Sequence, residues 1–198
     1  VGSEMCIRDS GMGLRAAQLF ADEGAKVLAT SWNMENLEKN LAGYSENIVL
    51  FQLDVREEDQ WASAAAKAEE LWGKIDILVN NAGLSAKCDL LKETLEGWEA
   101  GLRMNLTSQF LGIKTVIPYM QKNGKGSIIN CSSLTALKGS MDAGAPAYCS
   151  AKAGLRALTR HVAYNFAKDN IRCNIVYPGS VYTNAVAKYG VSFEQMAA

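Results

Sequence analysis

This chain lacks most of the features by which metal-binding, membrane-spanning and nucleic-acid-binding proteins are recognised. It has one histidine, His161, and no CxxC pair or cysteine/histidine cluster, so nothing suggests a metal site, which needs several ligands. No apolar run approaches the ~18 residues that a membrane-spanning helix requires. The formal net charge of −1 offers no electrostatic attraction to nucleic acid or to an anionic membrane.

The cysteines give no sign of a disulfide framework. They are odd in number and widely separated, at Cys6, Cys88, Cys131, Cys149 and Cys173. Frameworks of disulfides usually show an even number of cysteines in a short chain. We therefore expect reduced thiols in a cytoplasmic protein. Hydrophobic residues make up 48% of the 198 positions, which is enough for the core of a single α/β domain.

Strand-like and helix-like segments alternate along the chain. Short runs rich in β-branched residues lie at 25–30, 48–53, 75–79, 127–131 and 172–177. Helical patterns lie between them, at about 11–23, 34–43, 57–73, 96–122 and 146–168. This alternation predicts a parallel sheet with helices on both faces, which makes three layers. The segment 134–147 is the most loop-like interior stretch, and we expect it to rim a pocket.

The first ten residues do not fit this pattern. A glycine-rich turn that opens a helix should follow a first strand, but here Glu4, Arg8 and Asp9 bring charges into a slot that should be apolar. We predict a degraded first strand. Since position 1 is also not methionine, we interpret residues 1–10 as a non-native segment joined to a truncated gene. A divergent native N-terminus is the alternative.

Tyr148 and Lys152 are the most informative pair, because residues four apart lie on one face of a helix, one turn apart. An ammonium group near a phenol lowers the pKa of the phenol from about 10 toward neutrality. Such a tyrosine can exchange a proton with an alcohol or a carbonyl near pH 7. The spacing also occurs by chance. It becomes more informative because the chain also contains Asn-Asn-Ala-Gly at 80–83, a serine pair at 132–133 and Pro-Gly at 178–179.

With these motifs in this order, the sequence resembles the classical short-chain dehydrogenase/reductase family, from about Ser10 to Thr183. The resemblance implies a Rossmann-like, doubly wound parallel sheet with a cofactor crevice at the carboxyl ends of its strands. It implies that 11–198 is a single dinucleotide-binding and catalytic domain whose last strand is missing. It also implies homodimers or homotetramers formed through the helices at 96–122 and 146–168.

The resemblance places the cofactor phosphates at the turn of Gly11, Met12 and Gly13, where backbone N–H groups and a helix N-terminus receive the pyrophosphate. The family has its first glycine four residues before Gly11, where this chain has Ile7. That departure weakens the expectation of tight phosphate binding.

The remaining implied cofactor contacts lie after later strands. Asp54 and Val55 match the adenine contact, although a strand-ending turn aspartate is the alternative reading of Asp54. Backbone close to the cofactor is implied for Asn81, Ala82 and Gly83, and contact with the nicotinamide end for Pro178, Gly179, Val181 and Thr183, of which Thr183 binds the carboxamide. Tyr148 and Lys152 complete the set at the nicotinamide ribose.

The resemblance also supplies the catalytic residues. Asn105 lies inside a predicted helix, where asparagine is intrinsically unfavourable, and it is implied to bend that helix and hold a water of the proton relay. Ser133 is implied to orient the substrate. Ser132 and Thr135 compete for that role, because the 15 residues from Ser133 to Tyr148 are slightly more than the family's usual gap. Tyr148 is then the acid/base of an NAD(P)-dependent oxidoreductase for an alcohol/carbonyl pair, aided by Lys152.

NADP is favoured over NAD. An NAD site normally has an acidic residue at the end of the second strand, ~20 residues past the glycine-rich turn. Here Ser31 takes that place, which removes a charge that would repel a 2′-phosphate. However, Trp32 stands where a phosphate-binding arginine would help, and only Arg15 and Lys39 are plausible substitutes.

Two other classes stay open. A non-catalytic nucleotide-binding protein can share this fold, but an intact set of Ser133, Tyr148 and Lys152 counts against it. An extended-type epimerase or dehydratase also uses Tyr-x-x-x-Lys, but the 80–83 tetrad and the Gly-x-Gly spacing favour the classical type. The sequence leaves the substrate open.

Overall fold

The computed structural model describes residues 3–7, 11–44, 46–85, 88–139 and 145–181, with side chains from residue 11 onward. Within that part, the strands form one six-stranded sheet in the order β3-β2-β1-β4-β5-β6, and every neighbouring pair is parallel. The strands are β1 (Ser3–Ile7), β2 (Lys26–Ser31), β3 (Ile48–Gln52), β4 (Ile77–Asn80), β5 (Gly126–Cys131) and β6 (Ile171–Val176). The predicted doubly wound parallel sheet is confirmed.

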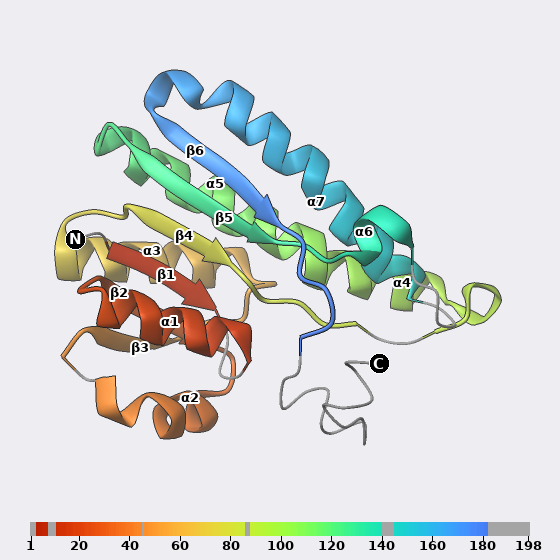
Figure 1. Ribbon diagram of the computed structural model, residues 1–198, viewed down its shortest axis with the longest axis horizontal. Coiled ribbons are helices and arrows are strands. Elements are labelled where there is room, and N and C mark those ends of the chain that lie inside the picture. Colours follow the sequence, from red (N-terminus) through yellow and green to blue (C-terminus); the bar gives the residue numbers. More distant parts are fainter. Residues whose placement is uncertain (1–2, 8–10, 45, 86–87, 140–144, 182–198) are drawn as a thin grey trace.

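Helices cover both faces of the sheet, as Figure 1 shows. On one side lie α1 (Met12–Asp22) and α2 (Met34–Leu41). On the other lie α3 (Glu58–Trp72), α5 (Ser108–Lys122) and α7 (Pro146–Asn165). Shorter elements are α4 (Leu95–Leu102), a π-helical segment (Arg103–Thr107), α6 (Thr135–Lys138) and the 3₁₀ turns Ala42–Tyr44, Leu90–Lys92 and Ala167–Asp169.

Each face of the sheet has its own hydrophobic core. Small residues of α1 such as Ala17 let that helix approach Val27 of β2 closely. On the other face, the fully buried Trp61 of α3 packs in the core that also contains Leu78 and Ile128. The indole N–H of Trp61 donates to the Val55 carbonyl at 2.9 Å, so the core directly fixes the turn that follows β3.

The first strand differs from the expectation. Residues 3–7, predicted to be a poor strand, occupy the central slot as β1, where Ser3–Ile7 pair with Lys26–Thr30 and Glu4–Cys6 with Ile77–Val79 (Figure 1). Parallel pairing joins backbone N–H and C=O groups, which every non-proline residue carries, so charged positions do not prevent the ladder. The non-native origin of residues 1–10 stays a prediction.

Two further local differences concern helices. The loop-like stretch 134–147 contains the single turn α6, and the helix predicted at 96–122 is α4, the π-helical segment and α5 in succession. The other predicted strands and helices are found within a few residues of their expected bounds. In the part of the chain that the structure describes, no helix is both long and apolar enough to cross a membrane. Cys88, Cys131, Cys149 and Cys173 carry free thiols.

Candidate active site

Parallel strands bring their carboxyl ends to the same side of the sheet (Figure 1). Several of the predicted site residues lie at or just after those ends. Ser31 ends β2, Asn80 ends β4 and Cys131 ends β5. In a doubly wound sheet, ligands bind outside these carboxyl ends, close to where the strand order reverses between β1 and β4. The candidate site therefore lies where the fold provides a crevice.

Lys152 is buried, with 2% of its surface exposed, although lysine is seldom buried without partners. Its Nζ donates to the Cys131 carbonyl at 2.7 Å and lies 5.7 Å from the centre of the Tyr148 ring. Its own carbonyl accepts from Ser132 Oγ at 2.9 Å. Because α7 begins with Pro146, a residue suited to the first helical turn, Tyr148 and Lys152 both fall on its first turns, with the cation beside the phenol.

Asn105 is fully buried in the π-helical segment. Its Oδ1 accepts from the Leu84 N–H at 2.9 Å, and its Nδ2 donates to the carbonyls of Leu84 at 2.8 Å and Gly101 at 3.0 Å. Single π turns inside α-helices are frequent at functional sites. The side chain joins the helix to the loop that follows β4.

The space between Asn105 and Lys152 at position 83 is too small for any residue but glycine. A Cβ built on Gly83 would lie 2.9 Å from Asn105 Oδ1 and 3.1 Å from Lys152 Nζ. The polar ends of Asn105 and Lys152 therefore converge on one backbone position, from two different helices. No larger residue fits there without displacing one of them.

The structure separates the two serines by their contacts. The Ser132 hydroxyl is buried, and its proton is engaged in a hydrogen bond to the Lys152 carbonyl. Ser133 is half-buried, and its Oγ accepts from the N–H of Thr135 at 3.2 Å and from the Thr135 hydroxyl at 3.0 Å. Thr135 thus positions Ser133. These contacts favour Ser133 over both rivals as the serine that meets a substrate.

The loop after β6 lies against the turn that contains Ser133. The Pro178 carbonyl accepts from the Leu134 N–H at 3.0 Å, and a Cβ on Gly179 would lie 3.2 Å from Leu134 Cδ1. Val181 follows and is exposed. Thr183 lies outside the described residues.

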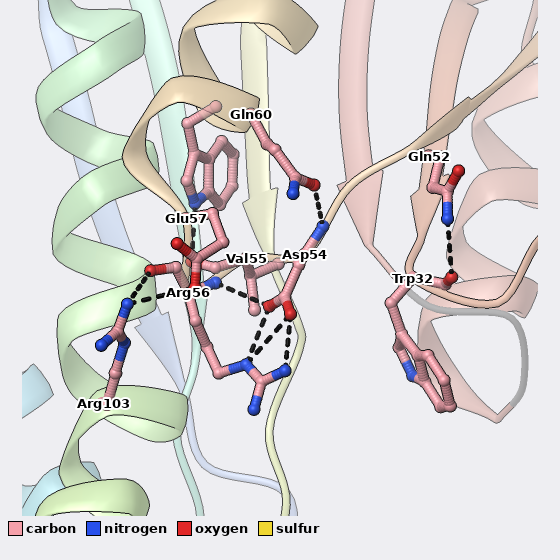
Figure 2. Close-up of polar contacts among 9 residues, drawn as sticks. Trp32, Gln52, Asp54, Val55, Arg56, Glu57, Gln60 and Arg103 are labelled. Carbon is pink, nitrogen blue, oxygen red and sulfur yellow. Dashed lines mark hydrogen bonds and ion pairs between the residues drawn. The ribbon is translucent and has the colours of Figure 1, made fainter.

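A pocket of about 370 Å³ opens beside this cluster. It brings together most of the residues expected to hold the adenosine part of a dinucleotide. Its lining is Ser31, Trp32, Leu53, Asp54, Val55, Arg56, Ala82, Leu84 and Met104. Leu84 and Met104 are neighbours of the Asn105 network, so the pocket and the polar cluster of Asn105 and Lys152 share a wall. Trp32, drawn in Figure 2, lines the pocket with an exposed side chain.

Arg56 is the residue that sequence reasoning missed. Its guanidinium forms a two-pronged ion pair with the Asp54 carboxylate, with Nη2–Oδ2 at 2.5 Å and Nε–Oδ1 at 2.9 Å (Figure 2). The Arg56 guanidinium holds the pKa of Asp54 below its usual value, since a hydrogen-bonded cation favours the carboxylate. Neither Arg15 nor Lys39, the expected cations, lines the pocket. The Asp-x-Arg spacing directly after a strand was the available signal.

At the start of α1, Gly11 adopts a φ of 69°, a left-handed value that glycine reaches without strain. It caps α1 without a side-chain hydrogen bond, Met12 is exposed and Gly13 is buried. Backbone N–H groups at such a helix N-terminus are suited to an anion. Ile7, where the family has glycine, is the last residue of β1.

A network of buried side-chain amides anchors the tetrad at 80–83, which begins with the last residue of β4. Asn80 donates to Asn130 Oδ1 at 3.0 Å, and Asn130 donates to the Thr159 hydroxyl at 2.9 Å. The Asn80 side chain thus connects β4 to β5 and, through Asn130, to α7. Asn81 follows directly, and Ala82 is buried at the pocket wall. Among the described residues, no group of His, Cys, Asp and Glu is arranged to bind a metal ion.

A doubly wound parallel sheet with a pocket and a glycine-bounded polar cluster at its carboxyl edge defines a dinucleotide-binding α/β protein. The fit to a dinucleotide rests on the pocket lining and on the close backbone approach at Gly83. A family model described as "Enoyl-(Acyl carrier protein) reductase" matches residues 6–198. The chain belongs to the short-chain dehydrogenase/reductase family, and it is an NAD(P)-dependent oxidoreductase for alcohol/carbonyl pairs.

Curated relatives share about a third of the aligned residues. The chain is 36% identical over 182 residues to 3-oxoacyl-(acyl-carrier-protein) reductase FabG of Thermotoga maritima, covering 90% of this chain and 73% of that protein. It is 36% identical over 196 residues to trans-4-hydroxycyclohexanecarboxylate dehydrogenase of Sinomonas cyclohexanicum, covering 94% and 74%. A crystal structure described as a short-chain dehydrogenase/reductase from Burkholderia xenovorans aligns with a TM-score of 0.90 at 28% identity, covering 95% and 75%.

Proposed function

We propose that Tyr148 is the general acid/base of this oxidoreductase and that Lys152, Ser133 and Asn105 support it. The observation that carries the proposal is the convergence at Gly83, where Asn105 Oδ1 and Lys152 Nζ both approach within about 3 Å of one Cβ position. The Lys152 ammonium also lies beside the Tyr148 ring. A buried cation, a phenol and a buried amide thus form one cluster at the edge of the sheet.

Each side chain has a distinct task. In reduction, Tyr148 donates its phenolic proton to the substrate oxygen, and in oxidation it removes that proton. Lys152 stabilises the phenolate that remains, since an adjacent cation favours the charged form. Ser133, held by Thr135, donates to the substrate oxygen and stabilises its developing charge. Asn105 would hold a water that continues the proton path toward solvent.

The nicotinamide cofactor supplies or accepts the hydride when it is bound. The turn of Gly11, Met12 and Gly13 would hold its pyrophosphate, and the pocket around Asp54 would hold its adenosine. The nicotinamide end would lie near Tyr148, Lys152 and the loop of Pro178, Gly179 and Val181, with Thr183 at the carboxamide. NADP is favoured over NAD, because Ser31 brings no negative charge to the end of β2.

The substrate class is a small alcohol or ketone, in keeping with the name of the relative from Sinomonas cyclohexanicum. The protein is proposed to assemble as a homodimer or homotetramer through the helices at 96–122 and 146–168. Support comes from large side chains exposed on these helices, Phe110 at 43% and Tyr164 at 86%. Sedimentation analysis tests the assembly, and a monomer at micromolar concentration would contradict it.

A turnover assay tests the function and separates it from the two rival classes. The purified protein is incubated with NADPH or NADH and a panel of ketones, and with the oxidised cofactors and the matching alcohols. Substrate-dependent change in nicotinamide absorbance supports the proposal. Binding of dinucleotide without turnover on any pair would favour a non-catalytic protein, and a keto intermediate with no net cofactor change would favour an epimerase.

A further inference from the structure

We propose that Arg56 is a specificity-determining residue, which cancels the charge of Asp54 and so lets the pocket accept the 2′-phosphate of NADP. This inference rests on the proposed cofactor role of the pocket. It assigns a function to a residue that contributes no atom to the proposed chemistry. It adds to the effect of Ser31, which brings no negative charge to the end of β2, because the Asp54–Arg56 pair leaves the pocket lining without net charge.

The Asp54 carboxylate is saturated by Arg56. Oδ1 accepts from the Arg56 backbone N–H at 3.0 Å and from Nε at 2.9 Å, while Oδ2 accepts from Nε at 3.2 Å and Nη2 at 2.5 Å (Figure 2). Two-pronged arginine–carboxylate pairs are among the stronger charge-assisted contacts. Asp54 therefore presents to the pocket as one member of a neutral pair.

The pair stands on a turn that is fixed from several sides. Gln60 Oε1 accepts from the Asp54 N–H at 2.7 Å, and the Trp61 indole holds the Val55 carbonyl. The Arg103 guanidinium donates to the Arg56 carbonyl at 3.2 Å and to the Glu57 carboxylate at 3.1 Å (Figure 2). Because the backbone on both sides of Arg56 is tethered, the guanidinium reaches Asp54 from a preorganised position.

The charge balance of the pocket depends on this pair. Among the described residues that line it, only Asp54 and Arg56 carry a formal charge, so the lining is neutral as a whole. Without Arg56 it would carry one negative charge, facing a phosphate monoester of about −1.5 to −2. A pocket of this size is roughly one Debye length across, about 8 Å at physiological salt, so the repulsion would be only partly screened.

The test compares Kd values, measured by fluorescence titration, for NADPH and NADH in five proteins: wild type, Arg56→Gln, Arg56→Lys, Asp54→Asn and the double variant Arg56→Gln/Asp54→Asn. Arg56→Gln should raise the NADPH-to-NADH ratio of Kd about threefold to tenfold at low salt, and less at high salt. The double variant, which is again neutral, should restore the wild-type ratio. Arg56→Lys, which keeps the charge, should change the ratio least.

Each outcome decides the matter. If Arg56→Gln weakens both dinucleotides equally, or neither, or if the double variant does not recover the ratio, then Arg56 does not set specificity. If the wild-type protein binds neither dinucleotide, the proposed function itself fails, and this inference with it. Binding of both dinucleotides with an unchanged ratio removes only the inference. Thermal melts of the five proteins confirm that each is folded.

Discussion

Asn105 and Leu84 exchange two hydrogen bonds, with the Leu84 N–H donating to Oδ1 at 2.9 Å and Nδ2 donating to the Leu84 carbonyl at 2.8 Å. The Asn105 side-chain amide thereby pairs with both backbone groups of Leu84, as a neighbouring strand would. Gly83, where Lys152 Nζ approaches, directly precedes Leu84 in the same loop. One side chain therefore fixes both the loop and the surroundings of the lysine.

Replacing Asn105 by alanine should cost both stability and activity. Two partly buried backbone groups of Leu84 would lose their hydrogen bonds to Asn105, so the free energy of unfolding should fall by about 1–3 kcal/mol. Chemical denaturation measures this, and kcat should fall in parallel. Asn123→Ala is the matched control, because Asn123 Nδ2 also donates to a backbone carbonyl, that of Ile75, at 3.1 Å. A variant of Asn105 with wild-type stability would show that these bonds contribute nothing.

Tyr148→Phe should abolish turnover without abolishing cofactor binding. The substitution removes the proposed proton donor and leaves the ring in place, so kcat should drop by several orders of magnitude. The Kd for NADPH should change little. Tyr164→Phe, on the exposed side of the same helix, should keep its activity. If Tyr148→Phe retains more than about a tenth of the wild-type rate, another group is the acid.

Gly83→Ala tests the convergence of Asn105 and Lys152. The added methyl would approach Asn105 Oδ1 to 2.9 Å and Lys152 Nζ to 3.1 Å, so one of them must shift. We expect kcat/KM to fall at least about tenfold, because misplacement of catalytic groups by an ångström is costly. Gly43→Ala is the control, since a Cβ there meets no atom within 4 Å. Equal activity of the two variants would contradict the assignment of this cluster.

The Asp54–Arg56 pair predicts a pH-dependent contribution to stability. The pKa of Asp54 is lower in the folded protein than its ordinary value, because Arg56 hydrogen-bonds the charged form. The contribution is therefore present above about pH 4 and lost as pH falls through the lowered folded pKa. Since Arg56 is half exposed, we expect about 0.5 kcal/mol. Denaturation of wild type and Arg56→Gln should differ at pH 6 and converge toward about pH 2, whereas a pH-independent difference would implicate another contact.

Ile7→Gly should tighten cofactor binding. Ile7 ends β1 at the position where the family has the first glycine of its phosphate-binding turn, and glycine lets backbone N–H groups approach a pyrophosphate. We expect the Kd for NADPH and for NADH to fall severalfold together, since both carry the pyrophosphate. Isothermal titration measures it. Weaker binding after the substitution would show that isoleucine suits the native turn.

The alternation of apolar runs and helical patterns was enough to predict the sheet, because parallel strands buried on both faces are apolar throughout, as Leu28 and Leu78 illustrate. The helical spacing of Tyr148 and Lys152 likewise predicted their proximity. In contrast, β1 escaped prediction because its ladder depends on backbone groups and its sequence carries Glu4.

The parts of the site that could not be predicted depend on directions of side chains in turns. Ser132 and Ser133 are adjacent and chemically identical, and only their contacts distinguish them, Ser132 with the Lys152 carbonyl and Ser133 with Thr135. The pairing of Asp54 with Arg56 also needs a turn that brings residues two apart onto the same side. Sequence spacing alone does not specify either geometry.

Two hydrogen bonds run in opposite directions between the end of β5 and α7, from Lys152 Nζ to the Cys131 carbonyl and from Ser132 Oγ to the Lys152 carbonyl. They make the strand end and the helix turn a single mechanical unit. Segments that decide which substrate enters can then diverge, or be exchanged between relatives by recombination, while this unit keeps its shape. The chemistry and the substrate range of the enzyme are thereby free to evolve separately.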